Sequence, residues 1–222
     1  MTDGTDGSPP RPRSPRMARD ERRAQVLRIA QDLFSSEGFH HVSMDDIADR
    51  AEVSKPVLYR HFPSKLDLYL AVVDQCGSDL LAAVDEAVAP LEAGPVQRGA
   101  GRDVIAAIVR AYIDFVDVAG ESSTLLFESD VTHDADVRAR VEHASSEAAR
   151  RIARVLSQVT GLAADASATL AVSLIAMAQG AATHRLRTTP VADAGLTAEL
   201  VTQLAWGGVA GLVRPDFVYE DA

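Results

Sequence analysis

The sequence predicts an all-α protein, and three observations support this fold class. Apolar residues recur with the 3.6-residue period of a helix, first at Val26, Ile29, Ala30, Leu33 and Phe34. Capping residues stand before several such segments, and glycine or proline follows them. No run alternates between apolar and polar residues, and no Asn-Gly pair signals a hairpin, so strands are not expected. We expect about nine helices.

The N-terminal part divides into a tail and two helices. Residues 1–18 are rich in Gly, Ser, Pro and Arg, with almost nothing apolar to bury, and are expected to be disordered. The helix that starts near residue 20 should stop at Gly38, because glycine terminates helices well. Ser43 and Asp46 have the spacing of a capping box, which predicts a second helix to about Arg50.

Two more helices follow at once. Ser54 is an expected N-cap, and Pro56 is tolerated in the first turn because its missing amide would be unpaired there anyway. Ser64 with Asp67 then opens a long helix that is expected to reach about Val88.

The remaining helices lie beyond a connector rich in proline and glycine, residues 90–101. Apolar periodicity places them near residues 102–119, 122–130, 135–160, 164–188 and 196–213.

Composition excludes several classes of protein. The single cysteine, Cys76, rules out an intrachain disulfide framework and indicates a reducing cytoplasm. The N-terminus lacks the apolar core of a signal peptide, and no uninterrupted apolar run reaches the ~18 residues of a transmembrane helix. The histidines lack zinc-ligand spacing, and no nucleophile motif or phosphate loop occurs. We expect a cytoplasmic protein that is not an enzyme, does not enter a membrane and needs no metal or cofactor.

Charge is distributed unevenly along the chain. The net charge is −10, yet residues 11–65 hold 11 basic and 8 acidic residues. The acidic excess therefore lies in the remaining residues. A mildly cationic segment joined to an acidic body is typical of a protein that binds DNA at specific sites, because the body repels nucleic acid elsewhere.

Residues 43–65 carry the strongest functional signal, a pair of short helices with a tight joint. Apolar residues on one side should hold the pair together: Ile47, Ala48, Val53, Leu58 and Phe62. The opposite side of the second helix carries cations, a valine and a tyrosine, which suit the major groove of DNA. These outward residues are Lys55, Pro56, Val57, Tyr59, Arg60 and His61. A helical hairpin with a merely solvated polar face is the alternative.

The expected DNA contacts divide into two kinds. Lys55 and Arg60 can donate to guanine edges, and Val57 can meet a thymine methyl group. Phosphate contacts position a protein without reading sequence. They are expected from Ser43, Tyr59, His61 and Lys65. Ser54 and Pro56, at the start of the second helix, complete the expected DNA-binding set.

The stretch from residue 20 to about 80 closely resembles the DNA-binding domain of tetracycline-repressor-type (TetR family) regulators. The similarity includes the Gly38-Phe39 pair, "IA" at 47–48, "LY" at 58–59 and "SK" at 64–65. It implies a homodimer that regulates transcription, with a three-helix helix-turn-helix domain at 19–80 and an effector-binding and dimerisation domain at 81–222. Glu52 departs from the pattern, because the family usually has glycine there, and this puts the joint geometry in question.

A narrower resemblance concerns the regulators of fatty acid synthase genes in actinobacteria. It rests on the helix-turn-helix segment together with "LLFESD" at 125–130 and "AWGG" at 205–208. Similarity to this subgroup implies control of lipid genes in response to long-chain acyl-CoA. The alternatives are a drug-responsive repressor of an efflux gene and, in a different class, a lipid carrier that does not bind DNA.

The body must hold a hydrophobic effector if it belongs to such a regulator. The helix at 102–119 is apolar almost all round, so it must be surrounded by plain core or by a core that contains a cavity. Residues expected to line the cavity are Leu81, Val84, Val88, Ile105, Ile108, Val109, Tyr112, Phe115, Leu126 and Phe127. A coenzyme A head group would need cations near the mouth, for which Arg98, Arg102 and Arg110 are candidates.

The last two long helices carry small residues that permit close helix packing, "AMAQGAA" at 176–182 and "AWGGVAG" at 205–211. A four-helix interface between two copies fits this pattern. Expected interface residues are Met177, Gly180, Trp206 and Gly207. Trp206 would be the anchor, and a place in the core of its own chain is the alternative.

Overall fold

The computed structural model describes residues 19–92, 100–127, 134–188 and 192–209, so the tail predicted at 1–18 lies outside the described residues. Within these ranges the chain forms nine α-helices, one short 3-10 helix and no strand, which confirms the all-α prediction. The helices are α1 (Arg19–Glu37), α2 (Met44–Arg50), α3 (Lys55–His61), α4 (Lys65–Glu92), α5 (Ala100–Ala119), η1 (Gly120–Ser123), α6 (Thr124–Phe127), α7 (Ala135–Thr160), α8 (Ala164–Arg187) and α9 (Ala194–Val209).

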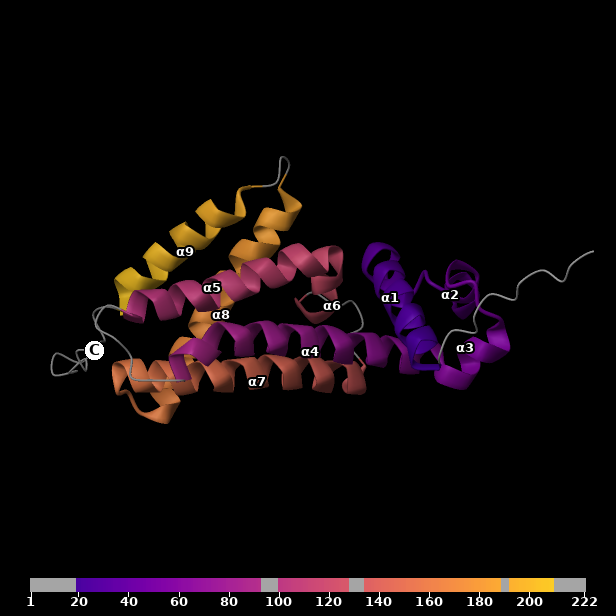
Figure 1. Cartoon of the computed structure of the whole chain (residues 1–222), viewed down its shortest axis with the longest axis horizontal. Helices are drawn as coiled ribbons and strands as arrows, with labels where there is room; N and C mark the ends of the chain where they lie inside the picture. Colours follow the sequence, from indigo (N-terminus) through magenta and orange to yellow (C-terminus); the bar gives the residue numbers. More distant parts are fainter. Residues whose placement is uncertain (1–18, 93–99, 128–133, 189–191, 210–222) are drawn as a thin grey trace, which may run out of the picture.

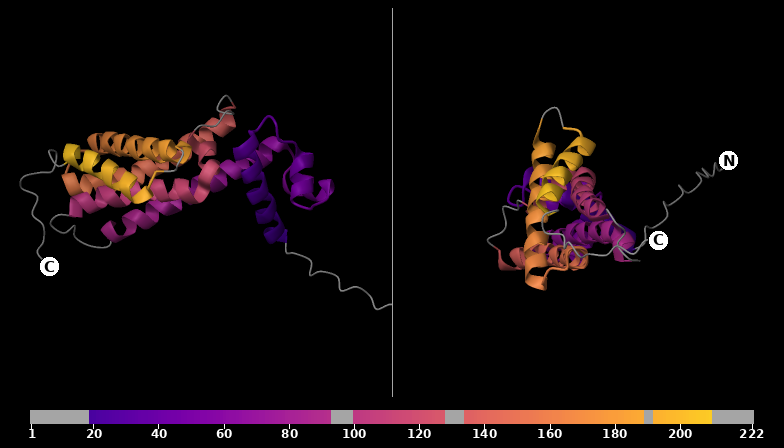
Figure 2. Two further views of the ribbon diagram at one scale, coloured as in Figure 1. Left: turned by 90° about the horizontal axis from the view of Figure 1, so that it is seen from above. Right: turned by 90° about the vertical axis from the view of Figure 1, so that its left-hand side faces the viewer.

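The helices form a small head and a larger body, joined by α4 (Figure 1). The head consists of α1, α2, α3 and the start of α4. In the body α5 packs against α4, α8 and α9, and α7 packs against α4 and α8. Viewed along the long axis, α8 crosses the body and α9 lies beside it (Figure 2). Helix α4 belongs to both the head and the body. A displacement of α4 in the body therefore also displaces the head.

Two predicted helix ends were wrong. The helix expected to stop at Val88 continues to Glu92 and contains Pro90. A proline removes only the bond to the carbonyl four residues earlier, and Glu86 is exposed to water, which can replace that partner. A single helix was expected at 122–130; its described part, residues 122–127, is instead the end of η1 followed by α6, and residues 128–130 lie outside the described residues. Here the Ser123 hydroxyl donates to the carbonyl oxygen of Gly120 at 2.8 Å, which favours the tighter 3-10 turn.

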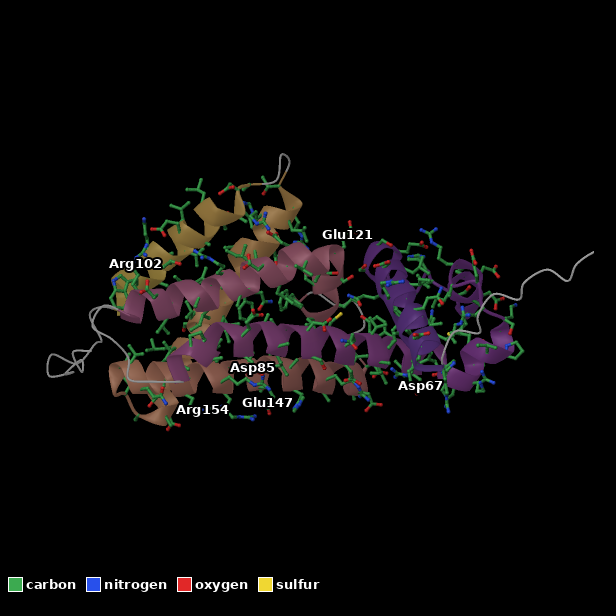
Figure 3. All side chains as sticks on the ribbon, viewed as in Figure 1. Asp67, Asp85, Arg102, Glu121, Glu147 and Arg154 are labelled. Carbon is green, nitrogen blue, oxygen red and sulfur yellow. The ribbon has the colours of Figure 1, made fainter. Side chains whose placement is uncertain are left out.

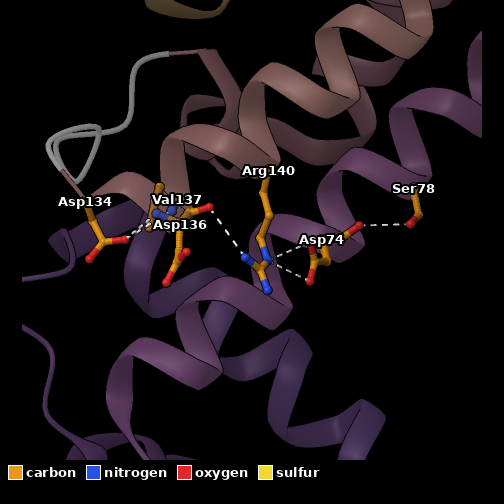
Figure 4. Close-up of polar contacts among 6 residues, drawn as sticks. All are labelled: Asp74, Ser78, Asp134, Asp136, Val137 and Arg140. Carbon is orange, nitrogen blue, oxygen red and sulfur yellow. Dashed lines mark hydrogen bonds and ion pairs between the residues drawn. The ribbon is translucent and has the colours of Figure 1, made fainter.

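Polar contacts fasten α7 to α4 along the body. The Arg140 Nε donates to Asp74 Oδ2 at 3.1 Å, and Asp134 caps α7 by accepting from the amides of Asp136 and Val137 (Figure 4). Arg151 makes a second link further along, to Asp85. Asp85 and Glu147 are labelled on the neighbouring helices α4 and α7 in Figure 3. These pairs are exposed and each contributes less than about 1 kcal/mol, so they set alignment more than stability.

A second contact between head and body is made by η1 and α6, which lie against α1. The Ser122 hydroxyl is buried and donates to the Ser35 hydroxyl of α1 at 3.4 Å. Helix η1 directly follows α5. The contact between η1 and α1 therefore connects the end of α5 to the first helix of the head.

Candidate nucleic-acid interface and effector core

The joint between α2 and α3 is held by the apolar residues that the sequence singled out. Ile47, Ala48, Leu58 and Phe62 are buried, and Val53 is half-buried. Each of these two helices is only seven residues long, so neither is stable alone. Their fixed geometry comes from this shared core.

Ser43 closes the capping box at the start of α2. Its hydroxyl donates to Asp46 Oδ2 at 2.6 Å and accepts from the Asp46 amide at 3.1 Å. The Ser43 amide also donates to Asp46 Oδ2, at 2.8 Å. The hydrogen bonds from Ser43 hold the pKa of the Asp46 carboxyl below its usual value. The single O–H of Ser43 is thus used on Asp46, and this bond would have to be given up before Ser43 could donate to a phosphate.

Ser54 stands at the N-cap of α3, but its side chain makes no capping hydrogen bond. The Ser54 carbonyl instead accepts from the amides of Val57 and Leu58, at 2.9 and 3.1 Å. The predicted side-chain cap was wrong. Its exposed hydroxyl is left for another partner, which suits a residue beside a phosphate.

Lys55 and Asp45 form an ion pair that joins α3 to α2. Lys55 Nζ lies 2.7 Å from Asp45 Oδ2, and more than half of each side chain is exposed. The hydrogen bond to Asp45 raises the pKa of the lysine. This ion pair uses one of the three N–H donors of Lys55 and leaves two for other acceptors.

Glu52 occupies the left-handed backbone region, with φ at 52°. The TetR family, which this segment resembles, usually has glycine at this position. Glycine is the residue that adopts positive φ without steric strain. The joint keeps its geometry despite the glutamate, since the Val53 amide donates to the Ala48 carbonyl at 3.0 Å. The doubt about the joint geometry is thereby answered.

The exposed face of α3 gathers the remaining predicted contacts. Tyr59 is 46% exposed, and Arg60 beside it is exposed too. Val57 and His61 are half-buried at the edges of this face. Partial burial lowers the pKa of His61, and so do the positive charges of Arg60 and the nearby α1 arginines. Pro56 is exposed at the start of α3.

Lys65 is tied to its own chain. Its ammonium donates to the carbonyl oxygens of Phe39 and Val42, at 2.8 and 2.9 Å, and lies 4.3 Å from the centre of the Phe39 ring. Two of its three N–H donors are thus used to fix the loop between α1 and α2. Only the third is left for a phosphate, a structural role that spacing in the sequence did not indicate.

The predicted effector residues come together in the body interior. Val84, Val88, Ile105, Ile108, Val109, Tyr112, Phe115 and Leu126 are buried, while Leu81 and Phe127 are half-buried. The Tyr112 and Phe127 rings stack with centroids 6.4 Å apart, and Phe115 meets Phe127 edge-on at 6.0 Å. None of these ten residues lines the cavities that we find among the described helices. These residues pack closely, so a ligand could bind among them only by separating their side chains.

The cations predicted for a coenzyme A head group differ in their surroundings. Arg98 lies outside the described residues. Arg102, labelled in Figure 3, pairs with Glu199 of α9 at 2.5 Å. Hydrogen bonds from Gln203 and from Arg102 lower the pKa of the Glu199 carboxyl. Arg110 is exposed on α5 and lines a cavity together with Asp114.

The predicted interface residues separate into two groups. Gly180 and Gly207 are exposed, with open space where a side chain would stand. Met177 is half-buried. Trp206 lies within its own chain, since a methyl group added at Gly101 of α5 would meet its ring at 2.8 Å. This contact favours the alternative for Trp206, a place against the core of its own chain.

Sequence reasoning missed a ridge on α9 and a groove beside α8. Leu196, Leu200 and Leu204 recur every four residues and are 60, 57 and 70% exposed. This ridge is visible in "GLTAELVTQLAW" as leucines at helical spacing. The groove between α7 and α8 encloses about 810 Å³. Its lining includes Ala149, Arg150, Ala153, Arg154, Ala168 and Val172. The groove forms where two consecutive helices pack against each other, and the local sequence pattern does not reveal it.

Comparison with known proteins agrees with this geometry. Residues 26–72, from the middle of α1 to the start of α4, match the family "Bacterial regulatory proteins, tetR family". The chain is 36% identical over 198 residues to the HTH-type transcriptional activator FasR of Mycolicibacterium smegmatis, covering 89% of this chain and 87% of FasR. That similarity extends through head and body.

Two solved structures share the fold. A TetR-like transcriptional regulator from a Rhodococcus species superposes with a TM-score of 0.70 and 28% identity, over 88% of this chain and all of that one. The regulator FadR of Bacillus subtilis, solved with stearoyl-CoA, superposes with a TM-score of 0.69, over 83% of this chain and 98% of that one. Its identity is only 12%, so it supports the fold alone. The exposed α3 face, the all-helical body and the 36% identity to FasR lead to one assignment: the chain is a DNA-binding transcriptional regulator of the TetR family, and not an enzyme.

Proposed function

We propose that the chain binds a palindromic operator as a homodimer in the cytoplasm and controls lipid metabolism genes in response to long-chain acyl-CoA. The observation that carries the proposal is the identity with FasR over 89% of the chain, since it includes the body where an effector would bind. The stearoyl-CoA bound to the FadR neighbour supports an acyl ligand for a body of this shape.

On DNA, α3 enters the major groove with its exposed face toward the bases. Arg60 and Lys55 donate to guanine edges, and Val57 meets a thymine methyl group. Tyr59, His61 and the capped Ser43 lie around them and reach phosphates. The joint of α2 and α3 supplies the rigidity that direct base contacts need.

Two copies of α3 read two half-sites about one helical turn apart, because the dimer is twofold symmetric. The test is a gel-shift assay with the natural operator and with a version carrying five extra base pairs between the half-sites. The insertion rotates the half-sites onto opposite faces of the DNA and should abolish tight binding. Unchanged affinity would exclude the symmetric dimer.

The dimer forms through α8 and α9. Four of the six large apolar residues exposed on the described surface lie on these two helices, namely Val172 and the three leucines of the α9 ridge. Helix α8 is also long and apolar enough to cross a membrane, although only 28% of its apolar window is buried in the chain. Burial by a second copy accounts for both features without a membrane.

In this dimer the α9 ridge of each copy lies along α8 of its partner and reaches the groove between α7 and α8. The groove offers alanines for the leucines to pack on, with Arg150 and Arg154 at its rim. The described part of α9 carries one charged residue, Glu199, and Arg102 of the same chain already pairs with it, so the ridge brings little unbalanced charge into the interface. Each copy thus supplies a ridge and a groove, as an isologous interface requires.

The effector binds in the apolar body interior. Each methylene of an acyl chain that is buried contributes roughly 0.8 kcal/mol, so affinity should rise with chain length until the site is full. A ligand between α5 and α6 displaces η1, which contacts α1 of the head. The ligand changes the affinity for DNA only if it binds more tightly to an arrangement of the two heads that differs from the arrangement bound by DNA.

The test is calorimetric titration of the protein with acyl-CoAs of graded length. Affinity that climbs with length and then levels off is expected, and Ile108→Asn should reduce it by placing an amide among apolar side chains. The control is Val118→Asn, at a residue 90% exposed on the same helix. Tighter binding of a rigid polycyclic compound than of any acyl-CoA would favour the drug-responsive regulator.

A further inference from the structure

Tyr112 is a tyrosine buried in an apolar core without a partner for its hydroxyl. It is 1% exposed and lies in the middle of α5. No residue that the structure describes forms a hydrogen bond with the phenol oxygen. Phenylalanine would fill the same space without this polar group, so packing alone does not account for the tyrosine.

The surroundings of Tyr112 are aromatic and aliphatic. Its ring stacks on Phe127, and Phe115 closes the same cluster from the next turn of α5. The other buried residues of α5 carry no polar side-chain group. Burial raises the pKa of the Tyr112 phenol, which therefore stays protonated at physiological pH and can donate a hydrogen bond. The hydroxyl is a single donor in an otherwise apolar interior.

We propose that the Tyr112 hydroxyl donates a hydrogen bond to the thioester carbonyl of the bound acyl-CoA. Tyr112 is then a specificity residue, which distinguishes acyl groups from alkyl chains of equal length. This inference rests on the proposed effector class and adds the atom of the ligand that is recognised. The Phe127 ring stacked on Tyr112 places the recognition next to α6, which contacts the head.

The acceptor is a neutral carbonyl rather than a carboxylate. A buried carboxylate needs a cation, because an unpaired charge in an apolar interior is far less favourable than an unpaired hydroxyl. Arg185 is the one buried cation among the described residues. Asp117 balances its charge and its Nη1 donates to the carbonyl oxygen of Ala192 at 3.1 Å, while its Nε and Nη2 make no hydrogen bond. A thioester oxygen needs only the one donor that Tyr112 supplies.

The experiment compares three ligands on the full-length protein by calorimetric titration. Palmitoyl-CoA carries the carbonyl, S-hexadecyl-CoA lacks it at equal chain length, and palmitate carries a carboxylate instead. The wild-type protein should bind palmitoyl-CoA about three- to tenfold more tightly than S-hexadecyl-CoA, the range for one neutral hydrogen bond. Tyr112→Phe should remove this preference and leave S-hexadecyl-CoA binding unchanged.

Thr202→Val is the matched control, because it removes another buried hydroxyl of the body, on α9, 1% exposed. It should preserve the preference for palmitoyl-CoA. The melting temperature of the ligand-free protein gives a separate readout. Tyr112→Phe should keep or raise it, since no bond is lost, and a clear decrease would mean that the hydroxyl has a partner in its own chain and would overturn the proposal.

The remaining outcomes are distinct. If Tyr112→Phe keeps the wild-type preference, Tyr112 does not recognise the carbonyl, while the acyl effector stands. If palmitate binds as tightly as palmitoyl-CoA and is weakened by Tyr112→Phe, the acceptor is a carboxyl group and the thioester assignment is wrong. If neither coenzyme A compound binds the wild-type protein, the proposed effector class falls, and the role of Tyr112 falls with it.

Discussion

The head and the body place their functional groups in opposite ways. In the head, a seven-residue helix turns one apolar side inward and exposes nearly everything that can touch DNA. In the body, α5 turns most of its side chains toward the interior. Large apolar side chains that stay exposed lie mostly on α8 and α9. The head therefore acts through an exposed polar face. In the function that we propose, the body acts through its interior and through apolar faces that a second copy covers.

The dimer face provides the largest expected effect. Leu200→Asp puts a carboxylate in the middle of the α9 ridge, where dimer formation would have to bury it without a partner. We expect monomers in analytical ultracentrifugation and a loss of operator affinity of at least about 100-fold, since one head alone reads one half-site.

The matched control is Val118→Asp, which alters the most exposed large apolar residue outside this face, at 90% exposure. It should remain dimeric and bind DNA normally. Monomers from both variants, or from neither, would contradict the distinction between the α9 ridge and the rest of the body surface.

Arg60 tests whether the head reads bases through α3. Arg60→Ala should weaken binding to the natural operator by roughly 1–3 kcal/mol and relax the preference at one base position. The protein should keep its melting temperature, because the side chain is exposed. Selection of bound sequences from a random library measures the preference. An operator preference that survives intact would remove Arg60 from the base-reading set.

Lys65 tests whether one head residue serves both fold and DNA. Lys65→Ala should weaken binding to all sequences alike and flatten the salt dependence by about one counterion. It should also lower stability by about 1–2 kcal/mol, because the carbonyls of Phe39 and Val42 lose their donor. Lys65→Met keeps the aliphatic stem and separates packing from charge. Full stability in both variants would show that the carbonyl contacts contribute nothing.

A substitution at Glu52 is expected to have the smallest effect, and it should increase stability rather than decrease it. Glu52→Gly should stabilise the protein by about 1 kcal/mol, because glycine adopts the positive φ found there without strain. Glu52→Ala removes the same charge but keeps the strain, so it should not stabilise. Urea denaturation of the two variants makes the comparison, and equal stability would assign the effect to charge.

Helix ends that follow local rules were predicted correctly, in the head and in the body alike. Helix α2 was predicted from the capping box of Ser43 and Asp46 and from the apolar residues around Ile47. The structure contains this capping box. Helix α7 was predicted at 135–160 and spans Ala135–Thr160, bounded by the Asp134 cap and by Gly161 with φ at 67°. Such ends are encoded by a few adjacent residues.

Several omissions concern contacts between residues that are distant in sequence. Lys65 reaches carbonyls more than twenty residues away, and Trp206 lies against Gly101 of another helix. The groove between α7 and α8 exists only once those helices pack. Periodicity identifies the apolar side of a helix, but it does not show which partner covers that side.

The most direct test of the whole account is operator affinity measured against acyl-CoA chain length on the full-length dimer. Head and body are connected through α4 and through the η1 contact with α1, so filling the body should change what the head binds. We predict that operator affinity falls progressively as the chain lengthens and then levels off once the interior is filled. An operator affinity that no acyl-CoA changes, together with release by a rigid polycyclic compound, would contradict it.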